Sequence, residues 1–199
     1  MLKELLKNTK FLSDIRTFYN NNEKEVIDIL LFGSIIKGKS KPSDIDLLII
    51  YKSKDNIDLN YQLKKQLEKY KLNIQITSKI YPDIFKANFK ARGSVLSEGY
   101  SLVNNISISE GLGYSNLKLF KYELKNLNKS ERMRFYYALY GRNNTEGVLK
   151  DLNAKKFSDT IILCPIANSE NMAEFFNSWK LVYLEMPVLI PIRMLDTFK

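Results

Sequence analysis

Hydrophobic residues in the first part of the chain follow two different periods. Over residues 2–20 they recur every three or four positions, which predicts an amphipathic helix that ends at the Asn run 20–22. The apolar runs 26–32 and 45–51 are bounded by turn residues and predict two buried strands. Farther along the chain, hydrophobic residues again follow either helical spacing or the alternation of a strand. In chain order the predicted elements are helix 2–20, strand 26–32, strand 45–51, helix 57–71, strand 72–78, helix 81–98 and strand 99–109.

The pattern changes after residue 109, where glycines enter a connecting segment and we expect a domain boundary. The predicted elements beyond it are a helix over 118–140 with a break at 128–130, a strand over 160–164, a helix over 169–179 and a final extended segment with two prolines. We therefore predict an α/β (α+β) protein with two domains, 1–109 and 110–199, of which the second is a small α+β unit.

Composition narrows the chemistry that this chain can perform. The 199 residues include no His and a single Cys, Cys164, which lies in an apolar run. Carboxylates are therefore the expected carriers of acid, base or metal chemistry, and no internal disulfide can form. No apolar stretch approaches the roughly 20 residues that a membrane span requires. We expect a cytoplasmic protein that does not interact with a membrane.

Positive charge favours a polyanionic partner such as RNA, DNA or a nucleotide, because the formal net charge is +9. Basic and aromatic residues alternate over 118–140, as a surface that binds a polynucleotide requires. The candidate nucleic-acid contacts are Lys121, Lys125, Lys129, Arg132 and Arg134. The alternative is that the aromatic residues form a core and the basic residues are a solvated face.

Two carboxylates stand where the second apolar run begins. Asp44 and Asp46 are two positions apart, so in a strand both point to the same face, and two like charges at this spacing favour a cation. Mg²⁺ is the expected ion because it prefers oxygen ligands and keeps substrate phosphates in its shell, and Mn²⁺ could replace it. Gly33 and Ser34 precede them with backbone N–H groups suited to a phosphate, and Lys37 adds positive charge.

An Asp-x-Asp pair is common by chance, and its spacing alone favours the end of a loop in which Asp46 meets a lysine. The longer segment FGSIIKGKSKPSDIDLLI, however, resembles the signature of the DNA polymerase beta-type nucleotidyltransferase superfamily, especially its minimal domain. The resemblance covers about residues 25–107 and leaves the C-terminal unit without a recognised family. It implies a nucleotidyltransferase-type mixed sheet flanked by helices, with Asp44 and Asp46 on a divalent metal and Gly33 and Ser34 on the nucleotide phosphates.

The resemblance also implies a third carboxylate on a later strand, and here the sequence departs from the family pattern. The matching position in 72–78 is Gln75, which alternation places on the face of the two aspartates. An amide can hold a metal weakly through its carbonyl oxygen, yet it cannot accept a proton from a nucleophile. Asp83 and Glu98 are the nearest alternative carboxylates in sequence, and Asp28 is a weaker one.

Two classes of function follow. The first is a Mg²⁺-dependent nucleotidyltransferase that moves a nucleoside monophosphate from an NTP to an acceptor hydroxyl on RNA, a protein or a small molecule. The second is a catalytically silent module of the same fold that binds nucleotide or nucleic acid, or serves as an antitoxin-like partner. Gln75 leaves open whether the chain is an enzyme.

Overall fold

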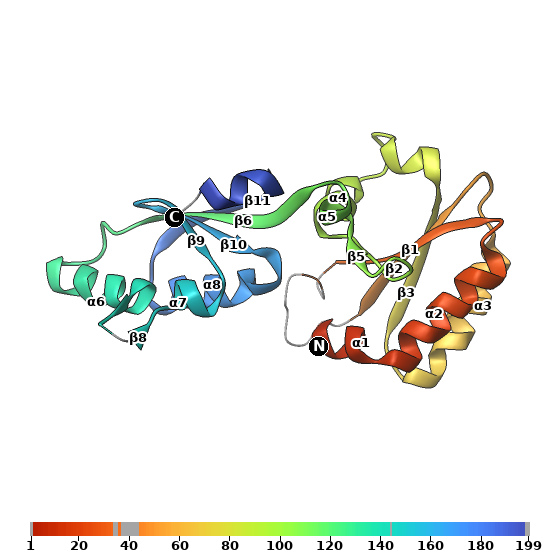
Figure 1. Cartoon of the computed structure of the whole chain (residues 1–199), viewed down its shortest axis with the longest axis horizontal. Coiled ribbons are helices and arrows are strands. Elements are labelled where there is room, and N and C mark those ends of the chain that lie inside the picture. The colour runs from red at the N-terminus through yellow and green to blue at the C-terminus, as the bar shows by residue number, and fades with distance from the viewer. Residues whose placement is uncertain (1, 34–35, 37–43, 144, 198–199) are drawn as a thin grey trace. The chain divides into compact units, whose positions relative to one another are not determined.

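The computed structural model of the chain describes residues 2–33, 36, 44–143 and 145–197 (Figure 1). It divides into two compact units, Met1–Leu112 and Gly113–Lys199. The sequence pattern had suggested a boundary after residue 109, and the division falls in the turn that follows, at Leu112. Among the described residues no helix combines the length and apolar character needed to cross a membrane.

The first unit is built on a five-stranded mixed sheet in the order β3-β2-β1-β4-β5. Its strands are β1 (Val26–Phe32), β2 (Ile45–Tyr51), β3 (Ile74–Ile80), β4 (Tyr100–Ser101) and β5 (Ile106–Ser107). β2 pairs with β1 antiparallel and with β3 parallel, while β1, β4 and β5 pair antiparallel. The bounds predicted for β1 and β2 are confirmed, because each is an apolar run whose side chains are buried on both faces of the sheet.

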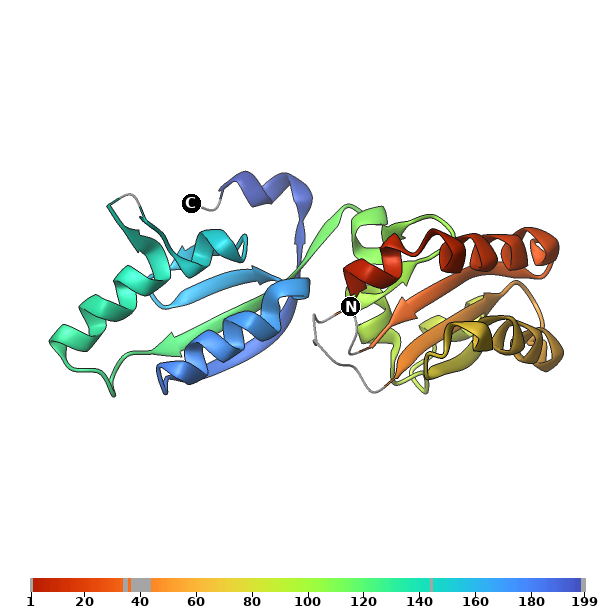
Figure 2. The same ribbon diagram turned by 90° about the horizontal axis from the view of Figure 1, so that it is seen from below.

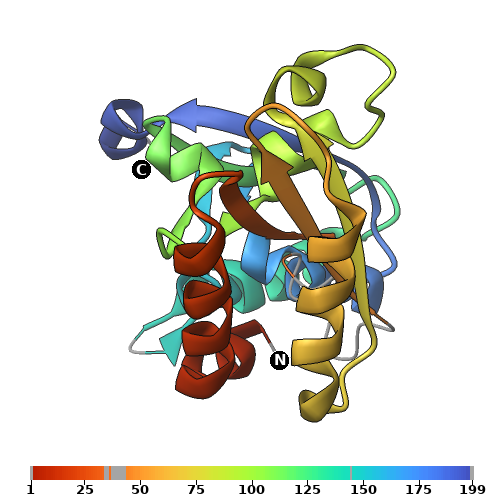
Figure 3. The same ribbon diagram turned by 90° about the vertical axis from the view of Figure 1, so that its right-hand side faces the viewer.

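Helices cover both faces of this sheet. They are α1 (Leu2–Lys7), α2 (Thr9–Asn22), α3 (Ile57–Leu67), α4 (Arg92–Glu98) and α5 (Ile108–Gly111), with 3₁₀ turns η1 (Glu68–Tyr70) and η2 (Tyr81–Phe85). α2 and α3 lie side by side against one face (Figure 3). α4 contributes Val95 to a core cluster with Leu30, Leu48 and Ile50 on the other face.

Two helices predicted for this unit are interrupted or shortened in the structure. The helix expected over 2–20 is interrupted at Asn8, whose side chain accepts a hydrogen bond from Phe11 N at 3.1 Å and so caps α2. The helix expected over 81–98 is wrong in its first half, where η2 and a turn region precede α4. Pro82 at the start of η2 fits this short turn.

The second unit contains a four-stranded antiparallel sheet in the order β11-β6-β10-β9. Its elements are β6 (Tyr114–Glu123), α6 (Lys129–Tyr140), β7 (Gly141–Arg142), β8 (Thr145–Glu146), α7 (Val148–Asp151), β9 (Lys155–Ser158), β10 (Ile161–Pro165), η3 (Ile166–Asn168), α8 (Ser169–Ser178), β11 (Val182–Pro191) and η4 (Ile192–Thr197). α6, α7 and α8 lie on one face of the sheet (Figures 1 and 2).

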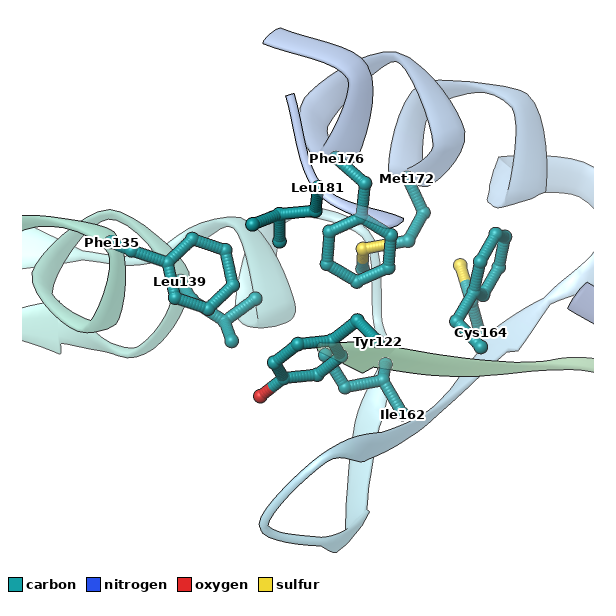
Figure 4. Close-up of a cluster of buried hydrophobic side chains, with 9 residues drawn as sticks. Tyr122, Phe135, Leu139, Ile162, Cys164, Met172, Phe176 and Leu181 are labelled. Carbon is teal, nitrogen blue, oxygen red and sulfur yellow. The ribbon is translucent and has the colours of Figure 1, made fainter. Parts of the chain in front are cut away.

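Aromatic side chains form the core between this sheet and its helices. Tyr122 on β6 packs against Phe135 on α6 and Phe176 on α8, with ring centroids 5.5 and 5.2 Å away (Figure 4). The helix predicted over 118–140 is therefore wrong before its predicted break at 128–130, and α6 begins at that break, at Lys129. Residues 118–123 belong to β6, which places Phe120 and Tyr122 in the core through strand alternation.

Candidate functional site

Gly33 directly follows β1 and adopts a backbone conformation that other residues rarely take. Its φ is +83°, and a Cβ added to it would lie 2.3 Å from Asp46 Oδ2. Glycine is therefore required twice here, once for the left-handed backbone and once for close approach to the carboxylate. The chain consequently brings its backbone directly against Asp46 where β1 gives way to the following loop.

Asp44 and Asp46 lie at the start of β2, next to the end of β1. Asp46 is registered with Phe32, the last residue of β1, and both aspartates are half-buried. Burial raises the pKa of Asp46, and the nearby charge of Asp44 raises it further. The two carboxylates therefore repel each other when both are ionised, and a divalent cation would relieve that repulsion.

Gln75 is the neighbour of Asp46 on the next strand. β2 and β3 run parallel with Asp46 registered opposite Gln75, and the backbone N–H of Ile45 donates to the carbonyl oxygen of Asn73 at 2.8 Å. Registered residues on adjacent strands share a face, so the exposed amide of Gln75 lies on the side of the sheet that carries Asp46. An uncharged group thus occupies the position beside the carboxylate pair.

The other carboxylates considered from the sequence lie elsewhere. Asp83 belongs to η2, which follows the far end of β3, and it forms an ion pair with Lys86 at 2.5 Å. Asp28 is registered with Ile50, near the opposite end of the two strands from Asp46. Glu98 ends α4 and is buried, and since Tyr100 of β4 pairs with Leu31, it lies toward the Gly33 end of β1.

The residues that could hold a divalent metal are Asp44 and Asp46, with the side-chain oxygen of Gln75 as a weaker neutral donor. Two adjacent carboxylates, one of them with a raised pKa, match the oxygen-donor set that Mg²⁺ takes when substrate phosphates and water complete its shell. The described residues contain no group of three or more His, Cys, Asp or Glu side chains arranged for a metal. Ser34 and Lys37, predicted to contact phosphates, lie outside the described residues.

The basic residues proposed for nucleic-acid contact do not share one helix. Lys121 is exposed on β6, and Lys125 in the following loop forms an ion pair with Glu123 at 3.1 Å. Lys129, Arg132 and Arg134 lie on α6, where they are exposed. Trp179 and Lys180 line, together with Arg134, a polar depression of about 460 Å³ in this unit, a feature that sequence spacing did not reveal because α6 and the end of α8 are distant in the chain.

Comparison with known proteins bears on the first unit. Residues 13–105 match the family model described as Polymerase beta, Nucleotidyltransferase, which confirms the resemblance carried by the Gly-Ser and Ser-Asp-Ile-Asp segments. No curated protein matches the chain significantly in sequence.

Solved structures similar to part of the chain include two toxin–antitoxin crystal structures. One, determined with AMP-PNP, is 19% identical, covers 46% of this chain and 71% of its own, and has a TM-score of 0.36. The other, the toxin–antitoxin MntA–HpeT with two Asp-to-Glu substitutions, is 16% identical, covers 46% of this chain and 70% of its own, and also has a TM-score of 0.36.

Proposed function

Because residues 13–105 form a nucleotidyltransferase-type domain, we propose that the chain is a Mg²⁺-dependent nucleotidyltransferase in the cytoplasm. It would transfer a nucleoside monophosphate from an NTP to an acceptor hydroxyl and release pyrophosphate. The observation that carries the proposal is the junction of β1 and β2, where Gly33 at φ +83° lies against the Asp46 carboxylate beside Asp44. A bare backbone next to two carboxylates suits a metal-bound triphosphate.

Each residue has a definite role in this proposal. Asp44 and Asp46 hold the divalent ion, which when bound neutralises charge on the phosphates and lowers the pKa of the acceptor hydroxyl. Gly33 and Ser34 contact the β and γ phosphates next to the end of β1, and Lys37 assists them. Gln75 orients water or the acceptor through its amide, and it does not take the acceptor proton because a neutral amide is not a base at neutral pH.

A silent nucleotide- or nucleic-acid-binding module of the same fold, or an antitoxin-like partner, is the second candidate. One observation favours it: Gln75 stands beside Asp46 where a third carboxylate would complete the site, and the described residues contain no three-carboxylate cluster. Such a module would bind Mg²⁺ and an NTP without turnover.

The basic residues of the second unit support RNA as one acceptor. Lys121, Lys125, Lys129, Arg132 and Arg134 are exposed, and exposed basic side chains neutralise backbone phosphates. A protein side chain or a small molecule remains an alternative acceptor, and the same assay distinguishes them.

The test is incubation of the chain with each labelled NTP, Mg²⁺ or Mn²⁺, and either total RNA or total protein, followed by gel separation. We expect label in one polymer, lost in Asp44→Asn and Asp46→Asn and retained in the control Asp55→Asn, an exposed carboxylate beyond β2. Calorimetric NTP binding that requires Mg²⁺ and Asp46, without label transfer to any acceptor, would establish the silent module instead. Absence of both transfer and NTP binding would exclude the transferase and the nucleotide-binding form of the silent module.

A further inference from the structure

A cavity lies on the face of the sheet that carries Asp46, but at the other end of β1 and β2. The cavity is lined by Leu30 of β1 and Ile50 of β2, among others. Ile50 follows Asp46 by four positions on β2, which corresponds to roughly 13 Å along the strand. The other lining residues come from η2, α4, β4, β5 and α5 and from the turns next to them. The cavity volume is about 600 Å³, within the range of pockets that bind small organic molecules.

The wall of this cavity is mostly apolar, with one buried carboxylate in it. Asp28 is only 8% exposed. Its Oδ1 accepts hydrogen bonds from the Ile29 backbone N–H at 2.7 Å and from Ser101 Oγ at 2.8 Å. Its Oδ2 accepts one long bond, 3.3 Å, from Asn104 Nδ2. A carboxylate oxygen can accept two hydrogen bonds, so Oδ2 retains capacity for a stronger donor.

Neighbouring groups hold the Asp28 side chain in place without neutralising it. Ser101 Oγ also accepts from the Asn104 backbone N–H at 2.9 Å, which links the carboxylate to the β4–β5 turn. Arg92 is the basic residue in the cavity wall, but its Nη1 donates to the Ala87 carbonyl oxygen at 2.6 Å. Within the described part of the chain no cation forms an ion pair with Asp28, and burial raises its pKa.

Large apolar side chains surround the mouth of the cavity. Tyr81, Phe85, Leu96 and Leu112 are each between 42% and 68% exposed. Exposed apolar residues are ordinary when scattered, but a group around one concave site marks a ligand or interaction surface. The cavity therefore combines apolar contact area with a single buried anionic acceptor.

We propose that this cavity binds a small organic cation, a largely apolar molecule whose protonated nitrogen donates a hydrogen bond to Asp28 Oδ2. The apolar walls cover the body of the molecule, and Asp28 selects for the positive group because its charge has no other counter-ion there. The site is separate from the carboxylate pair, so it goes beyond nucleotide transfer and does not depend on it.

The direct test uses three probes of one shape: 2-naphthylmethylamine as the cation, 2-naphthylmethanol as the neutral analogue and 2-naphthoate as the anion. Titration into the ¹⁵N-labelled full chain should shift the amide signals of Gly93 and Ser101 with the amine. The alcohol should bind at least about tenfold more weakly, since charge-assisted hydrogen bonds are roughly twice as strong as neutral ones. Naphthoate should not bind.

Two variants locate the binding site. Asp28→Asn should weaken the amine at least about tenfold and bring it to the level of the alcohol. Gly93 lines the cavity, and a Cβ added there meets no atom within 4 Å, so Gly93→Phe adds a large side chain at the cavity without a clash at Cβ. This variant should fold and lose the amine, whereas Gly93→Ala should fold and keep it.

Three results would overturn the proposal. Equal binding of amine and alcohol would remove the role of charge, and unchanged binding to Gly93→Phe would place the probe elsewhere. If no probe binds and sedimentation shows a dimer that Gly93→Phe dissociates, the cavity mouth is an interface between two copies of this chain.

Discussion

At the scale of single residues, Gly33 and Asp46 constrain each other. The φ of +83° and the 2.3 Å approach of a hypothetical Cβ to Asp46 Oδ2 both exclude a side chain at position 33. Gly33→Ala should therefore lower the free energy of unfolding by roughly 1–3 kcal/mol, through backbone strain and displacement of the carboxylate. Gly93→Ala is the matched control, because its Cβ meets no atom and its backbone is helical.

Denaturant titration of both variants measures this difference. Gly93→Ala should be neutral or stabilising by about 0.5–1 kcal/mol, since alanine is favoured over glycine inside a helix. Equal stability of Gly33→Ala and the wild type would show that the end of β1 adapts to a side chain, and the close approach to Asp46 would lose its significance.

The raised pKa of Asp46 gives a pH-dependent prediction in the absence of metal. The unfolded carboxyl ionises near its ordinary pKa of 3.8, while the folded one retains its proton to higher pH because of burial and Asp44. Stability is therefore lost as pH rises from the unfolded pKa through the folded pKa, and it stays lost above it. Asp46→Asn should melt higher than the wild type at pH 7.5 in EDTA, and the difference should shrink toward pH 4.

Thermal melts at both pH values, with EDTA and then with Mg²⁺, check this expectation. Added Mg²⁺ and NTP should raise the melting temperature of the wild type and leave Asp46→Asn unchanged, because a ligand stabilises only the state that binds it. A lower melt for Asp46→Asn in EDTA would mean that the carboxylate has a structural role instead.

Gln75 bears on which group accepts the proton of the acceptor hydroxyl in the proposed reaction. Gln75→Asp would place a third carboxylate on the strand beside Asp46. If a missing base limits the rate, nucleotide transfer should rise about 10²-fold, the lower end of what a positioned general base contributes. Gln75→Asn is the control, because its side chain has the size and shape of Asp without the charge, and it should not increase the rate. A wild type that transfers rapidly and is slowed by Gln75→Asp would show that another residue accepts the proton.

At the scale of secondary structure, the sequence predicted the strands that local patterns determine, but not the strand that depends on pairing with distant segments. β1 and β2 were predictable to the residue because each is an apolar run of seven residues bounded by polar turns. β6 was mistaken for a helix because its apolar residues fit both periods. It is a strand because β10 and β11, far along the chain, pair with its two edges.

The same distinction applies to the candidate site. Asp44, Asp46 and Gly33 lie within one short segment whose spacing has a chemical meaning. The neighbour relation between Asp46 and Gln75 depends on the parallel register of β2 and β3, and the cavity around Asp28 depends on seven separate elements. Sequence alternation gives the face of a residue, but it does not give the partner strand or the space between elements.

The pairing of β6 with β11 carries its own prediction, because it includes a buried lysine. Lys118 on β6 forms an ion pair with Glu185 on β11 at 3.1 Å, and its side chain is only 10% exposed. Glu185→Gln would leave the ammonium without its counter-ion. Since Glu185 itself is partly exposed, we expect a loss of about 1–2 kcal/mol, between the values for surface and buried pairs.

Glu123→Gln provides the control on the same sheet. Glu123 pairs with Lys125 at 3.1 Å, but both side chains are largely exposed, so its loss should be within about 0.5 kcal/mol. Urea titration of both variants gives the comparison. Equal losses would mean that burial of Lys118 does not strengthen its ion pair.

At the scale of the whole molecule, the two units have separate hydrophobic cores. The first unit packs its core around the mixed sheet, and the second packs Phe120, Tyr122 and Phe176 between its own sheet and helices. Leu112 and Gly113, where the units divide, lie in a turn. The proposed nucleotide site lies within the first unit, and the proposed nucleic-acid residues lie within the second.

This separation predicts that fragment 1–112 folds alone and keeps nucleotide binding. Its size and complete five-stranded sheet are sufficient for an independent core, and all the carboxylates of the proposed site are inside it. The fragment should unfold cooperatively and bind Mg²⁺ and NTP with the dissociation constant of the full chain. The same fragment with Asp46→Asn should fold but not bind them.

Labelled transfer to RNA should require the full chain, because the basic residues are in the second unit. A folded fragment that binds no nucleotide would show that residues of the second unit complete the site. Transfer to RNA by the fragment alone would remove the role proposed for the basic residues of the second unit.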